Sequence, residues 1–191
     1  MSDALRVAAA LQEIIESSDI SSQAKSVFSA RLKQGKLTRD DNPYSHFCVY
    51  FAALDPALKQ VFIGHHKKSG LWLFNGGHMD KGETPQEAVI REMGEEWGNS
   101  WAVIPKPALL TLTQIEKPQA QICQWHYDIW YFVPVDKNSF HPDQALLAKE
   151  FHEIGWKSLS NARAFVTDPS THTALKYLES SGSTILIIPT Q

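Results

Sequence analysis

Residues 76–98 read GGHMDKGETPQEAVIREMGEEWG, and the fold and chemistry expected of this chain follow mainly from this stretch. Glu92, Glu95 and Glu96 stand at positions i, i+3 and i+4, so on a helix their carboxylates lie on one face. Taken alone, such a triplet is more often a solvated surface. Because like charges at this spacing repel one another, a divalent cation held between them explains the pattern better. Carboxylate oxygens suit Mg²⁺ or Mn²⁺.

The acidic triplet is predicted to lie on a helix that spans residues 84–97. Thr84 is suited to the N-cap, and Pro85 to the first helical position, where its missing N–H costs nothing. An apolar stripe at i, i+4 and i+8 can dock this helix on a sheet while the acids face outward. The stripe consists of Val89, Met93 and Trp97. One helix is therefore expected to be both a core element and a platform for metal.

The whole stretch resembles the signature box of the Nudix superfamily. The residues that carry the resemblance are Gly77, Glu83, Arg91, Glu92, Glu95, Glu96 and Gly98. They straddle a predicted loop and helix after a predicted strand, which is the structural context that a motif match requires. The chain departs from the family pattern at the last position of the box. There Asn99 replaces the usual aliphatic residue. This change affects how the end of the helix packs, because no metal ligand lies at that position.

The resemblance implies an enzyme, a Mg²⁺-dependent (or Mn²⁺-dependent) hydrolase that splits a pyrophosphate bond in a nucleoside diphosphate derivative or a related diphosphate. It implies that Glu92 and Glu96 are the principal metal ligands and that Glu95 binds a further ion or helps to activate water. The two glycines at 76 and 77 allow a sharp turn and a close approach of the backbone to a ligand. In the family, the carbonyl that matches Gly77 often contacts metal.

Two further roles follow from the same resemblance. Arg91 and Glu83 resemble the family's buried ion pair, which orients the catalytic glutamates; we assign this pair to support and not to proton transfer. The family places its general base variably, sometimes on a glutamate outside the box. Glu150 and Glu153 are the candidates for a base or an extra ligand, and Glu153 is preferred because it enters the last predicted strand.

Histidines and lysines near the box are weaker candidates for substrate contacts. His78 and His126 are kept as substrate-site candidates, although a histidine at a strand end is more often structural. Lys67 and Lys68 lie in a predicted loop where they could meet phosphate, but a solvated turn is the commoner role. Four aromatic residues could stack on a base, and core packing explains them equally well. These are Trp72, Phe74, Tyr127 and Trp130.

Outward from the box, the pattern predicts strands and helices in mixed order. Two short helices are expected within residues 1–35, a linker at 37–45 and a closing helix at 170–180. Short strands are predicted at 46–54, 60–65, 71–74, 108–115, 121–135 and 153–156, with Asn75-Gly76-Gly77 ending the third and Lys117-Pro118 forming a turn. This order indicates an α+β fold. With the resemblance, we expect a Nudix-type α/β/α sandwich around a mixed sheet, with residues 1–40 as a helical extension and 41–191 as the Nudix domain.

Bulk composition limits the classes of partner. The 191 residues, 43% hydrophobic and 20% charged, are enough for one compact domain. A net charge of -3 and a pI of about 6.2 argue against a polymeric nucleic acid or an anionic membrane as partner, so we expect a small-molecule diphosphate substrate. The sequence shows neither the pattern of a signal peptide nor a membrane-spanning apolar run, so we expect a cytoplasmic location. Cys48 and Cys123 lie in apolar stretches without the spacing of a metal knuckle, which predicts buried free thiols. The exposed faces of the N-terminal helices could form a homodimer seam.

Two non-hydrolytic functions on the same scaffold stay open. The first is an enzyme similar to isopentenyl diphosphate isomerase. The box of that isomerase is degenerate, whereas the box of this chain is complete. The sequence also shows no cysteine and histidine arrangement that matches the isomerase's active site. The second is a nucleotide-binding sensor, which has no need of an intact acidic triplet. Downstream of the box the chain has none of the additional family signatures for NADH, ADP-ribose, coenzyme A or diadenosine polyphosphates. The resemblance therefore does not select a substrate.

Overall fold

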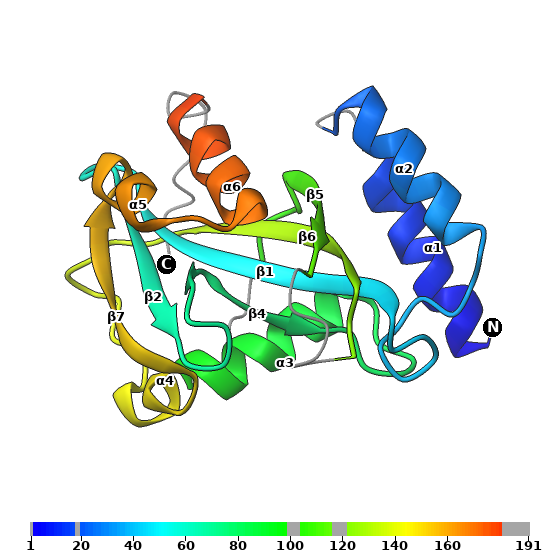
Figure 1. Cartoon of the computed structure of the whole chain (residues 1–191), viewed down its shortest axis with the longest axis horizontal. Coiled ribbons are helices and arrows are strands. Elements are labelled where there is room, and N and C mark those ends of the chain that lie inside the picture. Colours follow the sequence, from blue (N-terminus) through cyan, green and yellow to red (C-terminus); the bar gives the residue numbers. More distant parts are fainter. Residues whose placement is uncertain (1, 18–19, 99–103, 116–121, 181–191) are drawn as a thin grey trace.

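The computed structural model describes residues 2–17, 20–98, 104–115 and 122–180 (Figure 1). Its helices are α1 (Asp3–Glu16), α2 (Ser22–Leu32), α3 (Pro85–Trp97), α4 (Gln144–Glu150), α5 (Leu159–Phe165) and α6 (Pro169–Ser180). Its strands are β1 (Ser45–Asp55), β2 (Gln60–His66), β3 (Trp72–Leu73), β4 (Asn75–His78), β5 (Leu109–Gln114), β6 (Trp125–Pro134) and β7 (Phe151–Ser158). Among the helices of these described ranges, none combines the length and hydrophobicity of a membrane-spanning segment.

Strand β1 is the centre of a mixed sheet. Along one edge β1 runs parallel to β6, with His46 opposite His126, and β5 joins the outer edge of β6 antiparallel. Along its other edge β1 pairs with β2 at one end and with β4 at the other, both antiparallel. Strands β3 and β7 pair with β2. The expected mixed sheet is confirmed, and the β1–β4 pairing brings the start of the box against the central strand.

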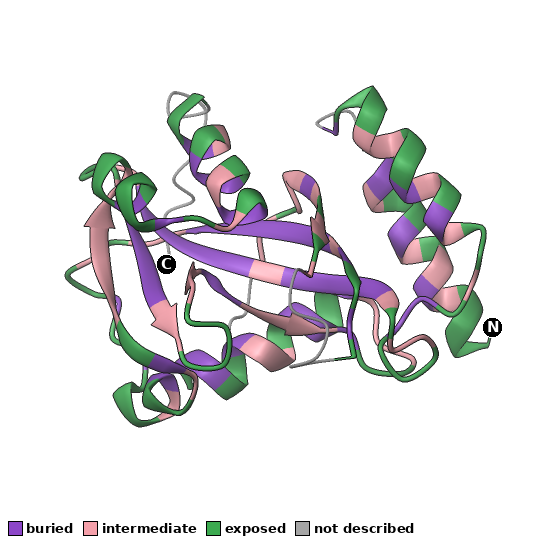
Figure 2. Ribbon diagram, in the orientation of Figure 1, coloured by how far each residue is buried: buried purple, intermediate pink, exposed green. Residues whose placement is uncertain are grey.

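Helices cover both faces of the sheet, and alternate side chains of β1 belong to two different cores. Side chains at positions 47, 49, 51 and 53 pack with α1, α2 and α3, whereas those at 52 and 54 pack with α5 and α6. Figure 2 shows β1 and β6 buried along most of their length between these layers. The predicted α/β/α sandwich is thus confirmed, and α3 lies on the first face.

The N-terminal helices share the core of the sheet. Val7, Leu11 and Ile15 of α1 are buried in the same cluster as α3 and β1. Arg31 of α2 is buried and donates hydrogen bonds to the carbonyls of Lys36 and Ser45, which ties the following loop to β1. The division into an extension at 1–40 and a domain at 41–191 stays a prediction.

Most of the expected elements are present, but three expectations need correction. Residues 75–77 were predicted to interrupt strand structure, but they belong to a strand, β4. Cys123 does not lie in a strand but two residues before β6 begins. The helices α4 and α5 were missed, because each has only 7 residues and too few turns to show a periodic apolar pattern. The predicted turn at Lys117-Pro118 lies outside the described residues.

Candidate active site

Helix α3 begins and ends where the sequence predicts. Thr84 is the N-cap: its hydroxyl accepts from the Glu87 N–H at 3.3 Å, and the Glu87 carboxylate accepts from the Thr84 N–H at 2.9 Å. Pro85 occupies the first turn, and Gly98 closes the helix in the left-handed conformation with φ 74°. These caps fix where the helix that carries the acidic triplet begins and ends. Asn99, the departure from the box, lies outside the described residues.

The apolar stripe of α3 is buried as expected, but one acid faces inward with it. Val89, Met93 and Trp97 are fully buried. Glu96 is only 7% exposed, so the prediction that all three acids face outward is wrong for this residue. Glu96 stands three residues after Met93 and directly before Trp97, so it lies at the edge of the apolar stripe and points toward the sheet.

Strand β4 holds the Glu96 carboxylate by hydrogen bonds. Oε1 accepts from the backbone N–H of Gly76 at 3.1 Å, and Oε2 accepts from the Asn75 side-chain amide. Burial raises the pKa of Glu96 to about 8. A positive charge beside this carboxylate, such as that of a bound cation, would favour its ionised form.

Glu92 lies against Gly77, the second glycine of the box. Its side chain is 12% exposed, and burial raises the pKa of its carboxyl group. A Cβ atom added to Gly77 would overlap the Glu92 carboxylate, so a glycine is required for this close approach. Gly77 thereby leaves room for the Glu92 carboxylate beside its own backbone. The resemblance places a metal at the carbonyl of this same glycine.

Arg91 links the loop of the box to the acids of α3. Its guanidinium donates to both carboxylate oxygens of Glu83, at 2.7 Å and 2.9 Å, and to the carbonyl of His78 at 2.9 Å. Its Nη1 also donates to Glu92 at 2.9 Å and lies 3.3 Å from a carboxylate oxygen of Glu95. The arginine–glutamate pair inferred from the sequence is therefore present. It braces the end of β4 against α3.

The donor set of the triplet fits Mg²⁺ or Mn²⁺, which prefer carboxylate oxygens. Glu92 and Glu96 are enclosed beside β4, while Glu95 has a side chain that is 59% exposed. Arg91 bridges Glu92 and Glu95. Among the described residues, two further groups of potential metal ligands lie outside the triplet, and both include His126. Within each group the donor atoms lie within 4.8 Å of one another.

The two general-base candidates lie in different surroundings. Glu150, at the end of α4, forms an ion pair with Lys68 at 3.7 Å, and its carboxylate lies 3.5 Å from Nε2 of His66. Besides burial, the charge of Glu150 contributes to the raised pKa of Glu96. Glu153 is exposed on β7 and lines a hollow of about 220 Å³ beside α4, which none of the box glutamates lines. Glu150, and not the preferred Glu153, is therefore the candidate whose charge acts on an acid of the triplet.

The lysines and aromatic candidates have structural partners. Lys67 donates to the carbonyl of Ala148 in α4, and Lys68 pairs with Glu150. Phe74 and Trp130 are buried in the core under α5 and α6. The other two aromatic candidates also contact protein rings: Tyr127 contacts Phe28 and Phe47, and Trp72 stacks on Phe165.

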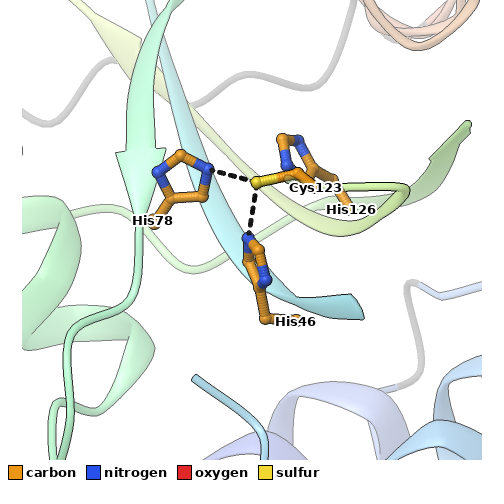
Figure 3. Close-up of side chains that lie close together, drawn as sticks. All are labelled: His46, His78, Cys123 and His126. Carbon is orange, nitrogen blue, oxygen red and sulfur yellow. Dashed lines mark hydrogen bonds between the residues drawn. The ribbon is translucent and has the colours of Figure 1, made fainter. Parts of the chain in front are cut away.

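His78 and His126 belong to a compact cluster with His46 and Cys123 (Figure 3). Burial, together with the neighbouring imidazoles, lowers the pKa of both His78 and His126 to about 3, so both rings are neutral at pH 7. Sequence reasoning missed His46 and considered the two cysteines only as free thiols. The local signal was the two-residue spacing between Cys123 and His126.

Comparisons with known proteins agree with this architecture. The family model for the NUDIX domain matches residues 31–177. The chain is 35% identical over 97 residues to "Putative nudix hydrolase 1" of Caenorhabditis elegans; the match covers 49% of this chain and 24% of that protein, so it spans about a quarter of the relative's length.

Two solved structures share the fold at low sequence identity. The Escherichia coli ORF135 protein gives a TM-score of 0.54 at 14% identity and covers 76% of this chain and 96% of its own. The MutT protein of Methanosarcina mazei Go1 gives 0.51 at 17% identity, with 74% and 97% covered. At these identities the likeness shows the fold alone. Since the family model covers most of the chain, from α2 to α6, the chain belongs to the NUDIX domain family.

Proposed function

We propose that this protein is a Nudix hydrolase that cleaves a pyrophosphate bond in a small diphosphate compound, in particular a nucleoside diphosphate derivative. The observation that carries the proposal is the enclosure of the Glu92 and Glu96 carboxylates against β4, where Gly76 donates to Glu96 and Gly77 leaves room for Glu92. Membership of the family supports the hydrolytic chemistry. A small-molecule substrate agrees with the net charge of -3. The cytoplasmic location and the homodimer stay predictions.

Glu92, Glu95, Glu96 and the carbonyl of Gly77 are the groups that would hold the metal. When bound, Mg²⁺ or Mn²⁺ neutralises charge on the phosphate oxygens and makes a bound water more acidic. The protein's own contribution is orientation: hydrogen bonds from β4 hold Glu96, and Arg91 holds Glu92. Because these carboxylates are already positioned, little reorganisation is needed when substrate binds.

Glu150 is our proposed general base, with Glu153 as the second candidate. Its charge contributes to the raised pKa of Glu96, which supports a role for Glu150 as acceptor of a proton from water beside the metal ligands. His66 and Lys68 hold its carboxylate in place. In the Glu150→Gln variant turnover should therefore fall, whereas Glu153→Gln should have a smaller effect.

The test is an assay with Mg²⁺ and Mn²⁺ over a panel of nucleoside diphosphate derivatives, in which an added phosphatase releases phosphate from the two phosphomonoester products. We expect metal-dependent release with the unmodified protein, and a loss of turnover by orders of magnitude in Glu92→Gln and Glu96→Gln, with the far-UV circular dichroism unchanged. Glu13→Gln is the matched control, because Glu13 is exposed on α1. Undiminished activity in both box variants would refute the assignment of the ligands.

The same panel separates the alternative functions. Conversion of isopentenyl diphosphate to its isomer would favour the isomerase. Nucleotide binding in a calorimeter without any release of phosphate would favour the sensor. Either result would contradict the hydrolase proposal.

A further inference from the structure

Four potential metal ligands from distant parts of the chain meet beside the end of β4. His46 comes from β1, His78 ends β4, His126 lies in β6, and Cys123 lies in the loop before β6 (Figure 3). One donor atom from each lies within 4.8 Å of the other three. The ring centroids of the three histidines are 4.9 Å to 5.1 Å apart. His46, Cys123 and His126 are buried, and His78 is half-buried.

Two distances in the cluster are close to those that a tetrahedral ion imposes. The Cys123 sulfur lies 3.7 Å from Nε2 of His46 and 3.7 Å from Nε2 of His78. Zinc bonds of about 2.3 Å to sulfur and about 2.0–2.1 Å to nitrogen, at tetrahedral angles, separate these atoms by roughly 3.5 Å. Nε2 of His46 and Nε2 of His78 therefore lie within a few tenths of an ångström of the separation from the sulfur that one shared ion requires, and the donor atom of His126 lies within 4.8 Å of the other three.

The ring nitrogens of His46 and His126 are prepared for coordination. Nδ1 of His46 lies 2.9 Å from the carbonyl oxygen of Asn42, which can only accept; Nδ1 therefore carries the proton and Nε2 has a free lone pair facing the sulfur. Metal-binding histidines are usually oriented in this way. Nε2 of His126 is buried without a hydrogen-bond partner among the described residues. A buried nitrogen left unpaired is costly, and an ion at the centre of the cluster would satisfy it.

We propose that His46, His78, Cys123 and His126 form a zinc-binding site that is separate from the carboxylate site. Three imidazole nitrogens and one thiolate suit Zn²⁺ and do not suit Mg²⁺. Four protein ligands close the coordination sphere, which is typical of a structural site. The backbone carbonyl of His78 accepts a hydrogen bond from Arg91, and Gly77 touches Glu92. The ion would therefore hold β4 in the position that orients the catalytic acids.

One contact of His78 must be given up when the ion binds. Arg39 Nη1 lies 3.4 Å from Nδ1 of His78, and a guanidinium can only donate. Coordination through Nε2 places the ring proton on Nδ1, so the two donors would face each other. Since the Arg39 residue is exposed and the contact is long, its side chain can turn into solvent at little cost.

A second set of ligands competes for His126. Cys48, His126 and Asp128 also have donor atoms within 4.8 Å of one another. This set has three members, and two oxygens of threonine hydroxyls already lie against the Asp128 carboxylate. The cluster with Cys123 provides four ligands and an oriented His46. The two cysteines therefore distinguish the two sets by experiment.

The direct test uses Co²⁺, which replaces Zn²⁺ and absorbs visible light. The full-length protein, stripped of metal, is titrated with CoCl₂ and then with ZnCl₂. We expect saturation at about one ion per chain, strong visible bands of a tetrahedral site, a thiolate-to-cobalt band in the near ultraviolet and displacement by zinc. Cys123→Ser should abolish the thiolate band. The matched control Cys48→Ser should retain it.

Further measurements keep the result interpretable if a variant does not fold. X-ray absorption at the zinc edge of the unmodified protein should show one sulfur at about 2.3 Å and nitrogens at about 2.0–2.1 Å. Glu92→Gln should keep full cobalt binding, which separates this site from the one proposed for catalysis. A folded protein that shows neither the thiolate band nor bound zinc would overturn the proposal. Loss of the band in Cys48→Ser, with the band intact in Cys123→Ser, would also overturn it.

Discussion

Gly77 shows how a residue without a side chain can control a catalytic group. The carboxylate of Glu92 occupies the space that any Cβ atom at position 77 would fill. Burial makes this carboxylate hard to ionise, so its exact place relative to a bound cation matters. The glycine is therefore a positional requirement of the site and does not serve chain flexibility.

At this scale we predict that Gly77→Ala lowers kcat by about a hundredfold, because displacement of a reacting group by about 1 Å has this effect. The added methyl group must push the Glu92 carboxylate away from β4. The measurement is steady-state phosphate release on the substrate found in the panel, with circular dichroism to show that the fold is intact.

Gly94→Ala is the matched control for this substitution. Gly94 lies within α3, and nothing would meet a Cβ atom there within 4 Å. We expect unchanged turnover and a gain in stability of about 0.5–1 kcal/mol, since alanine is favoured over glycine within a helix. Equal activity in the two variants would show that the contact between Gly77 and Glu92 is unimportant.

Among the elements, α3 depends on its own N-terminus for its position. The reciprocal hydrogen bonds of Thr84 and Glu87 satisfy N–H groups that would otherwise lack partners at the start of the helix. The first acid of the triplet follows two turns later. A frayed start would therefore loosen the link between Glu83 and Arg91 as well as the helix.

For this element we predict that Thr84→Ala destabilises the protein by about 1 kcal/mol, the usual cost of losing an N-cap side chain. In a chain of this size the melting temperature should fall by about 2–4 °C. Ser2→Ala is the control, because Ser2 caps α1 without a side-chain hydrogen bond. Thermal unfolding followed at 222 nm measures both variants. A similar loss in both would contradict the role of the capping box.

Strand β4 shows why a local pattern misled the interpretation of residues 75–77. Glycines weaken an isolated strand, so Asn75-Gly76-Gly77 predicts a break. In the structure Gly76 pairs with Tyr50 of β1, and a Cβ atom at position 76 would overlap the backbone of Val49. The glycine permits a close approach of two backbones, and pairing with β1 supplies the hydrogen bonds that stabilise the strand.

In the molecule as a whole, α1 packs into the core that contains α3. Leu11 of α1 is fully buried in this core, whereas Leu5 of the same helix is 62% exposed. The N-terminal helices thus cover the same face of the sheet as the helix that carries the acids. Their burial gives them a structural role in the unit that contains the site.

At this scale we predict that Leu11→Ala lowers the free energy of unfolding by about 2–5 kcal/mol, the usual cost of truncating a buried leucine. Leu5→Ala should change it by less than about 0.5 kcal/mol. Urea unfolding followed by tryptophan fluorescence and by circular dichroism should show one transition in both cases. If Leu11→Ala instead produces a separate early transition and leaves the main one unchanged, residues 1–40 form an independent extension.

Local sequence was sufficient to predict the helix of the box and its caps. These features depend on residues within one or two turns of each other, so spacing and helix geometry suffice to predict them. The pairing of Arg91 with Glu83 also followed from the sequence, through the resemblance to a known family. The tertiary structure bears out these expectations at the level of individual contacts.

Three features depend on tertiary contacts: which acid is buried, the pairing of residues 75–78 as a strand, and which histidines meet Cys123. Glu96 is enclosed because β4 packs over α3. The histidine and cysteine cluster forms because β1 pairs with β4 on one side and with β6 on the other. The physical reason is that strand pairing joins segments far apart in the chain, and local spacing carries little information about such contacts.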